Sequence, residues 1–258
     1  MIGFTIKKTF FDFWDHLFPV VILNLGFILL AAIPLVLPSW LYRFGVGASA
    51  ASFVLGILIL FLYAGTVSFM MYEVACYRQP GFLEFVQFFK ESWPSSLALG
   101  GIAILHLFIL MVAFPVYASI KSILGPIALV LLFWISVLWI LSSLYFFPIR
   151  VQLDTNLKKI LKKCFLVFFD NTGFTVFLAL GAAVIFVLSA LTAFLLPGVT
   201  GILLWFQVGF KLRLLKYDYL EQHPDADRKH IPWDTLLEEE RERVGKRTLK
   251  GMIFPWKE

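Results

Sequence analysis

The chain has 258 residues, of which 60% are hydrophobic and only 15% are charged. Soluble domains have about 25% charged residues, so this composition excludes a protein whose whole surface faces water. The net charge of +5 would suggest nucleic acid or acidic lipid as the partner of a soluble protein. Here the positions of the charges are more informative than their sum, and we expect no nucleic-acid partner.

Five long stretches carry no Asp, Glu, Lys or Arg, and they are residues 16–42, 44–72, 92–120, 122–149 and 171–210. A helix needs about 20 apolar residues to cross the hydrocarbon core of a bilayer. The last stretch has 40 residues and is interrupted at Pro197-Gly198, so it is long enough for two crossings. The first stretch is too long for the core of a cleavable signal peptide, and we expect it to be retained.

These stretches predict an all-α integral membrane protein with six transmembrane helices. The predicted spans are about 18–37, 50–72, 96–117, 125–148, 173–195 and 199–215. The sixth span is the least apolar, because Lys211 and Arg213 lie in its last turns. We expect both side chains to extend toward the lipid headgroups.

The distribution of Lys and Arg predicts the orientation. If residues 1–17 are cytoplasmic, the inside segments hold 20 basic residues, whereas the outside loops hold only Arg43 and Lys121. Cytoplasmic loops of membrane proteins carry an excess of Lys and Arg. We therefore predict that both termini are cytoplasmic.

Aromatic pairs recur along the chain, at Phe10-Phe11, Phe88-Phe89 and Phe168-Phe169, with spacings of 78 and 80 residues. Each pair lies in an amphipathic segment that precedes an apolar stretch. This pattern predicts three repeats of one unit, an interfacial helix followed by a helical hairpin. Aromatic residues at the ends of spans are common in membrane proteins, so coincidence is the alternative.

Several segments resemble the YesL-like bacterial membrane proteins. They are Ile22-Leu23-Asn24-Leu25 leading to Ile33-Pro34-Leu35, Gly81-Phe82-Leu83-Glu84-Phe85 with Phe88-Phe89-Lys90, and Phe147-Pro148 followed by Asp154 and residues 157–163. The resemblance covers about residues 10–195, and it implies a multi-pass protein of the bacterial plasma (inner) membrane. It also implies a link to carbohydrate uptake without a known biochemical activity. The charged segment after Tyr217 is a departure from the family, so no function there follows from it.

Three amide or imidazole side chains fall within predicted spans, at Asn24, His106 and Gln207. Each has two interpretations: a hydrogen bond that joins neighbouring helices, or a position on a solute pathway. We favour the first for all three. No Asp, Glu, Lys or Arg lies in the middle of a span, which argues against a proton-coupled carrier.

The basic residues Lys158, Lys159, Lys162 and Lys163 follow the spacing of one helix face. Leu157, Ile160, Leu161 and Phe165 are predicted to lie on the other face. Such a helix would lie on the inner leaflet and attract anionic lipid. Its role is either a topology anchor, which we favour, or a dedicated regulatory lipid site.

No residue pattern predicts catalysis or a bound cofactor. His223 and His230 are near two aspartates, but a structural zinc site needs four ligands and no cysteine is close, so we expect no metal. The sequence has no phosphate-binding loop, HExxH or GxSxG motif. We therefore expect that the protein is not an enzyme.

We divide the chain into a transmembrane helical domain, 1–217, and a cytoplasmic charged tail, 218–258. In the tail, Glu239 with Arg243 and Glu242 with Lys246 are spaced as i, i+4 pairs, which supports an exposed helix. The apolar end, residues 252–256, either folds back on the membrane, docks on a partner or is disordered.

The sequence favours an accessory or scaffolding subunit, linked by the resemblance to carbohydrate uptake. Its expected partners are membrane lipids of the anionic inner leaflet and transporter subunits. The alternative is an uncoupled small-solute transporter or channel, with Asn24, His106 and Gln207 lining its path. The sequence leaves the oligomeric state open.

Overall fold

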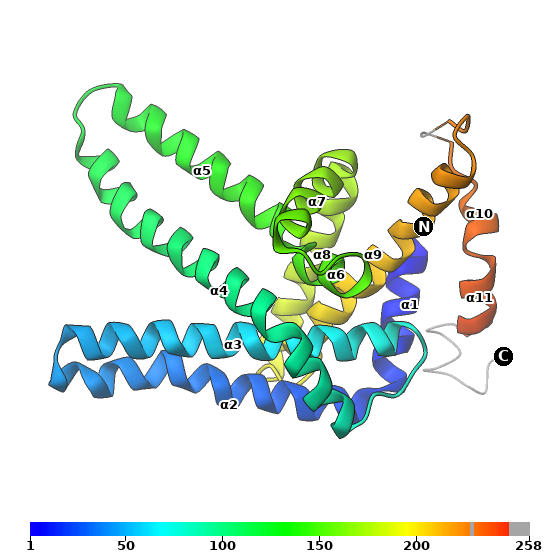
Figure 1. The fold of residues 1–258 in the computed structure, drawn as a ribbon, viewed down its shortest axis with the longest axis horizontal. Coiled ribbons are helices and arrows are strands. Elements are labelled where there is room, and N and C mark those ends of the chain that lie inside the picture. Colours follow the sequence, from blue (N-terminus) through cyan, green and yellow to red (C-terminus); the bar gives the residue numbers. More distant parts are fainter. Residues whose placement is uncertain (228–229, 248–258) are drawn as a thin grey trace.

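A computed structural model describes residues 1–227 and 230–247, and it is helical throughout, with no strand in those ranges (Figure 1). The elements in chain order are α1 (Ile2–Asp15), α2 (Leu17–Leu41), the 3-10 helix η1 (Tyr42–Phe44), α3 (Val46–Ala75), α4 (Phe82–Ser119), α5 (Leu124–Ser143), α6 (Phe146–Gln152), α7 (Leu157–Asp170), α8 (Thr172–Leu191), α9 (Gly198–Gln222), α10 (Trp233–Leu236) and α11 (Glu238–Val244).

Six helical segments are long and apolar enough to cross a membrane, which confirms the expected number. They contain α2, α3, α4, α5, α8 and α9, and their positions agree with the predicted spans to within a few residues at most ends. A helical chain with six such segments is of the multi-pass membrane protein class. The largest difference is at the start of α4, where one helix of 38 residues replaces the expected interfacial helix and separate span.

The fourth predicted span, 125–148, is divided between α5 and α6 because of Pro148. α5 ends at Ser143, and Pro148 is the third residue of α6. Proline lacks an amide hydrogen, and its ring clashes with the carbonyl group four residues earlier, which here belongs to Leu144. A proline is tolerated in the first turn of a helix, so the chain ends one helix and begins another.

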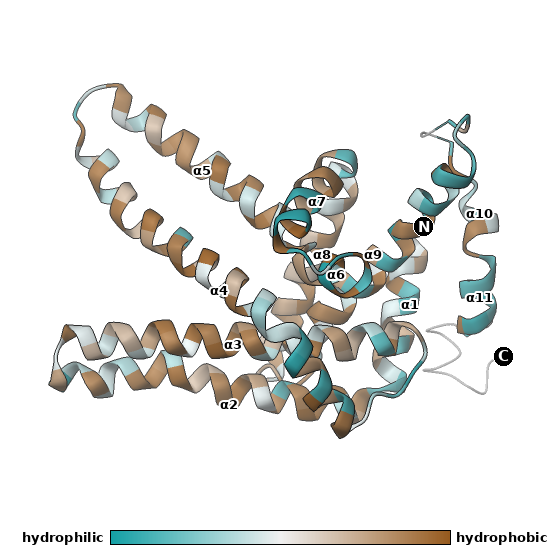
Figure 2. Ribbon diagram, in the orientation of Figure 1, coloured by the Kyte–Doolittle hydropathy of each residue, from teal (hydrophilic) through white to brown (hydrophobic). Residues whose placement is uncertain are grey.

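The α2–α3 and α4–α5 hairpins project from the body of the molecule as two diverging arms (Figure 1). α2 approaches α3 closely where Gly56 faces Pro34, since a Cβ atom on Gly56 would come within 2.8 Å of the proline nitrogen. α4 crosses α3 where Gly65 faces Ser96. The arms are mostly apolar on all sides, and polar residues concentrate at the opposite end of the molecule (Figure 2).

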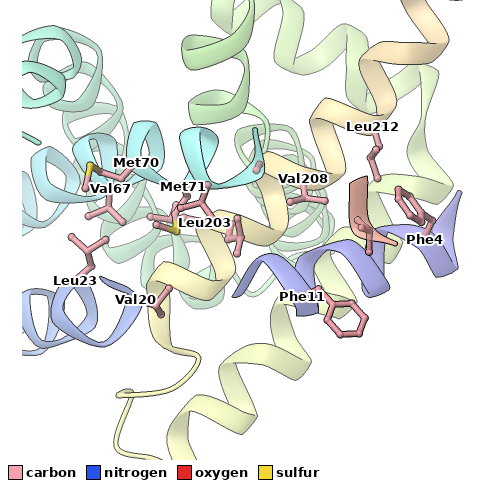
Figure 3. Close-up of a cluster of buried hydrophobic side chains, with 14 of the residues drawn as sticks. Phe4, Phe11, Val20, Leu23, Val67, Met70, Met71, Leu203, Val208 and Leu212 are labelled. Carbon is pink, nitrogen blue, oxygen red and sulfur yellow. The ribbon is translucent and has the colours of Figure 1, made fainter. Parts of the chain in front are cut away.

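α9 is the central helix. In its most apolar window 67% of the residues are buried, compared with 11% for the corresponding windows of α4 and of α5–α6. Leu203, Val208 and Leu212 on α9 belong to one hydrophobic cluster with Phe4 of α1 and Val67 of α3, as Figure 3 shows. The apolar surface that α4 and α5 leave exposed is what a bilayer would cover.

Candidate functional site

α1 buries two of its four charged residues, Lys8 and Asp12, and exposes several apolar ones. Lys8 is 0% and Asp12 is 4% exposed, whereas Ile2, Ile6 and Trp14 are each about half exposed. This is the reverse of a helix that lies on the surface of a soluble protein. It fits a helix whose outer side contacts lipid and whose inner side contacts polar groups of the protein.

The buried charges of α1 form a cluster with the carboxyl-terminal arm, which we define as residues 230–247. Nζ of Lys8 lies 3.0 Å from Oδ2 of Asp12 and 3.4 Å from Oε2 of Glu240. Nζ of Lys211 lies 2.7 Å from Oε1 of the same glutamate. The hydroxyl of Tyr77 donates a hydrogen bond of 2.8 Å to Glu240 Oε2. Glu240 therefore joins α1, the end of α3 and α9.

Burial controls the titration of this cluster. It raises the pKa of Asp12 to about 6, against the opposing charge of Lys8, and it lowers the pKa of Lys8. Burial also acts to raise the pKa of Glu240, but the hydrogen bond from Lys211 and the charge of Lys8 outweigh it, so this pKa is lowered. Lys8 and Asp12 are in ionic contact without the orientation of a good hydrogen bond.

Further contacts hold the carboxyl-terminal arm along α1. Nζ of Lys7 donates to the carbonyl oxygen of Gly245, and the guanidinium of Arg247 binds the carboxylate of Asp15 at 2.8 Å. Leu237 and Val244 are buried in the same hydrophobic cluster as α1. A groove of about 950 Å³ with acidic and basic side chains on its walls remains between α1 and the arm. The two segments thus form one packed unit.

The expected i, i+4 pairs of the arm are formed in part. Nη2 of Arg243 lies 2.5 Å from Oε1 of Glu239, whereas no ion pair joins Glu242 to Lys246 within the described chain. α11 has only seven residues, and it ends at Gly245, whose φ is +73°. The apolar end of the tail, 252–256, lies outside the described residues. The boundary expected at 217 falls within α9.

Asn24 caps the start of α9. Its Nδ2 donates to the carbonyl oxygens of Leu195 at 3.0 Å and Pro197 at 2.7 Å, and its Oδ1 accepts from the amide of Thr200 at 3.0 Å. These bonds satisfy backbone groups that a turn and a helix end leave unpaired. Gly198 has φ +66°, and a Cβ atom there would lie 2.3 Å from the Asn24 amide, so only glycine fits.

Gln207 joins three helices. Its Nε2 donates to Oγ of Ser68 on α3 at 2.6 Å, and its Oε1 accepts from Nε2 of Gln152 at 2.7 Å. The side chain is 0% exposed. Asn24 and Gln207 are therefore both used in bonds between helices.

His106 lies on α4 about two turns beyond Gly100, where α4 is packed against Phe61 of α3. Its Nε2 is buried without a hydrogen-bond partner, while the side chain as a whole is partly exposed. In the part of the chain that the structure describes, no hydrogen bond connects it with Asn24 or Gln207. The three polar residues do not form one site.

The basic cluster lies on α7 and is open to the surroundings. Lys158, Lys159 and Lys162 are exposed, and Lys163 pairs with Asp154 at 3.2 Å. The side of α7 that packs on the protein consists of Ile160, Cys164, Val167 and Phe168. Of the apolar residues predicted opposite the lysines, Ile160 is buried and Leu157 and Leu161 pack against the same cluster, whereas Phe165 is 37% exposed.

Lys211 ends in an ion pair with Glu240 of the carboxyl-terminal arm. Its extension toward the headgroups stays a prediction. The sequence did not single out Lys8, Asp12 and Glu240 as a group. One signal was available, because Lys8 and Asp12 are spaced as an i, i+4 pair next to apolar residues. Their partner Glu240 is more than 200 residues away, and no local pattern indicates it.

Comparisons with protein-family models, curated proteins and solved structures found no match. The resemblance to the YesL-like proteins therefore stays a prediction.

Glu240→Gln should destabilise the protein by about 3 to 5 kcal/mol, because it leaves the Lys211 charge without its carboxylate and Lys8 with Asp12 alone. Glu239→Gln is the matched control, since Glu239 makes only an exposed pair and should cost less than about 1 kcal/mol. Thermal unfolding of both variants in detergent measures the difference. Equal unfolding temperatures would show that the cluster does not hold the arm.

Asp12 should make stability depend on pH. Its pKa of about 6 lies above the ordinary value of 3.8, so the folded protein keeps a proton that the unfolded chain releases. The stability contributed by Asp12 is then complete below about pH 4 and is lost as pH rises through 6. Glu240 acts in the opposite sense, since its lowered pKa removes stability only as pH falls below its ordinary value of 4.5.

Unfolding of the wild type and of Asp12→Asn, measured from pH 4.5 to 7.5, tests this contribution. Asn cannot titrate, so the decline of stability toward pH 7 should be smaller in the variant. The charged groups that face Asp12, Lys8, Lys211 and Glu240, are unchanged in it. The same pH profile in both proteins would contradict the assignment.

Proposed function

We propose that this chain is an accessory or scaffolding subunit of the bacterial plasma membrane, with a link to carbohydrate uptake. One observation carries the proposal. Asn24 and Gln207, the two amide side chains that are fully buried within the apolar helices, are used to connect helices and not to line a path. The link to carbohydrate uptake is supported only by the resemblance to the YesL-like proteins.

The proposed orientation has both termini in the cytoplasm. The split of 20 basic residues against two supports it. The arrangement of the ion pairs is consistent with this orientation, because each of them within the described chain joins segments predicted to be inside. Examples are Lys8 with Glu240, Arg150 with Glu91 and Lys216 with Asp170. Separated inside segments thus meet at one end of the molecule.

We also propose that the chain contains three related units, α1–α3, α4–α5 and α7–α9. The recurring aromatic pairs support this, since they lie in α1, in the first part of α4 and at the end of α7. In the second unit the expected interfacial helix is continuous with the span. At 1.5 Å per residue, α4 is about 57 Å long, which exceeds the hydrocarbon core of about 30 Å, so part of it lies outside that core.

The alternative is an uncoupled small-solute transporter or channel. His106 is the observation in its favour, because its buried Nε2 has no hydrogen-bond partner. A path would have to pass along α4, where the side chains that surround His106 are largely apolar. We do not propose an enzyme, since the sequence contains no set of residues that would act together on a substrate.

Orientation can be tested with an impermeant thiol reagent. Ser122→Cys, on the exposed loop before α5, should react in intact spheroplasts, whereas Lys158→Cys on α7 and the native Cys76 should react only after the inner face is opened. Cys164 should stay unreactive until denaturation, because burial raises its pKa to about 12. Reaction of Lys158→Cys in intact spheroplasts would refute the orientation.

The function itself is tested by affinity purification in mild detergent, with and without the carboxyl-terminal arm. An accessory subunit should retain transporter subunits, and purified protein in liposomes should pass no more solute than empty vesicles. Flux by the pure protein that is lost in His106→Ala, with normal folding, would instead establish the transport alternative. His16→Ala is the matched control, since His16 lies outside the apolar part of the chain and binds only the carbonyl oxygen of Asp12.

A further inference from the structure

Arg213 on α9 is a partly buried cation that forms no ion pair with an acidic side chain of the described residues. No ion pair or hydrogen bond of its guanidinium occurs among residues 1–227 and 230–247, and its Nε is enclosed and unsatisfied. The neighbouring basic residues differ, because Lys211 pairs with Glu240 and Lys216 pairs with Asp170. A charge that is partly removed from water without an ion-pair partner is costly, which points to an anion that binds at Arg213.

The guanidinium lies against two aromatic rings. Its Cζ atom is 4.4 Å from the ring centre of Phe174 on α8 and 5.6 Å from that of Trp233 on the carboxyl-terminal arm. Ring faces hold the planar group in place by cation–π attraction and leave its N–H donors, which point outward in the plane, available. The residue is partly exposed, so an outside anion can reach it.

Asp170, the carboxylate whose charge acts on Arg213, is already paired with Lys216. Oδ2 of Asp170 accepts from Nζ of Lys216 at 2.9 Å, from the hydroxyl of Tyr217 at 2.9 Å and from Nδ2 of Asn171 at 3.1 Å. Turning this carboxylate toward Arg213 would break these three hydrogen bonds. Asp170 therefore acts on Arg213 through its charge, but its direct ion pair is with Lys216.

We propose that Arg213 binds the phosphate of an anionic phospholipid in the inner leaflet. Its depth supports a lipid. Lys211, two residues earlier, donates to the carbonyl oxygen of Ala75 at the end of α3, so Arg213 lies level with the ends of the apolar helices. Headgroup phosphates lie at this level, and arginine matches their geometry with two parallel hydrogen bonds.

The helix that carries Phe174, α8, also has an apolar surface suited to acyl chains, on a different side from Phe174. α8 starts next to Phe174 and exposes Val176, Leu180 and Val184 along its length. A free phosphate ion would gain nothing from this apolar face, whereas a phospholipid would cover it. The site is separate from the exposed lysines of α7. The proposal rests on the proposed orientation, in which this end of the protein lies at the inner leaflet.

The test is titration of delipidated protein in detergent with phosphatidylglycerol, followed by native mass spectrometry. Arg213→Gln should weaken the first bound lipid about 10- to 100-fold, the effect of one charged hydrogen-bonded contact. Arg43→Gln is the matched control. Arg43 also lies over two rings, Trp40 and Phe44, but in a loop that is predicted to be on the outer side of the membrane. This variant should bind like the wild type.

Three further results decide the proposal. Arg213→Lys keeps the charge but not the paired donors, so its affinity should lie between those of the wild type and Arg213→Gln. Millimolar inorganic phosphate should not displace the lipid, and displacement would show a site for small anions and overturn the proposal. Equal lipid affinity in the wild type and Arg213→Gln would also overturn the proposal. If Arg213→Gln does not fold, equal affinity in the wild type and Arg213→Lys would do the same.

Discussion

The fold depends on the neutralisation of charges where α9 leaves the apolar part of the molecule. α9 is enclosed by α1, α3 and α8, yet it carries Lys211 and Lys216 in its second half. Charges in such a setting need a partner, because removal from water costs several kcal/mol for each ion. Glu240 and Asp170 are these partners. The carboxyl-terminal arm is therefore part of the body of the protein. Through Glu240 it contacts both α1 and α9.

Polar joints fix the helices where hydrophobic packing alone would allow sliding. Between apolar helices in lipid no hydrophobic effect selects one register, so hydrogen bonds and close contacts of small residues do so. Asn24 sets the turn before α9 against α2, and Gln207 sets α9 against α3. Tyr63 of α3 donates to the carbonyl of Leu23 and aligns the first hairpin with the same point.

Beyond these joints the molecule opens. α2 continues for 17 residues past Asn24, about 25 Å, and α4 and α5 diverge from α3 with mostly exposed apolar faces. A rigid, polar-bonded base with apolar arms is compatible with a subunit that organises lipid or other membrane helices around itself. It offers less support for a solute path, because the base encloses its polar groups in bonds.

The sequence by itself determined the class of the protein and the number of its apolar helices, because length and lack of charge are local properties of each segment. It also identified Asn24 and Gln207 as polar contacts within the apolar helices. The pairing of Lys8 and Lys211 with Glu240, and the isolation of Arg213, were decided only by the tertiary structure. Such contacts join residues far apart in the chain, and their energies depend on burial, which no local pattern of residues specifies.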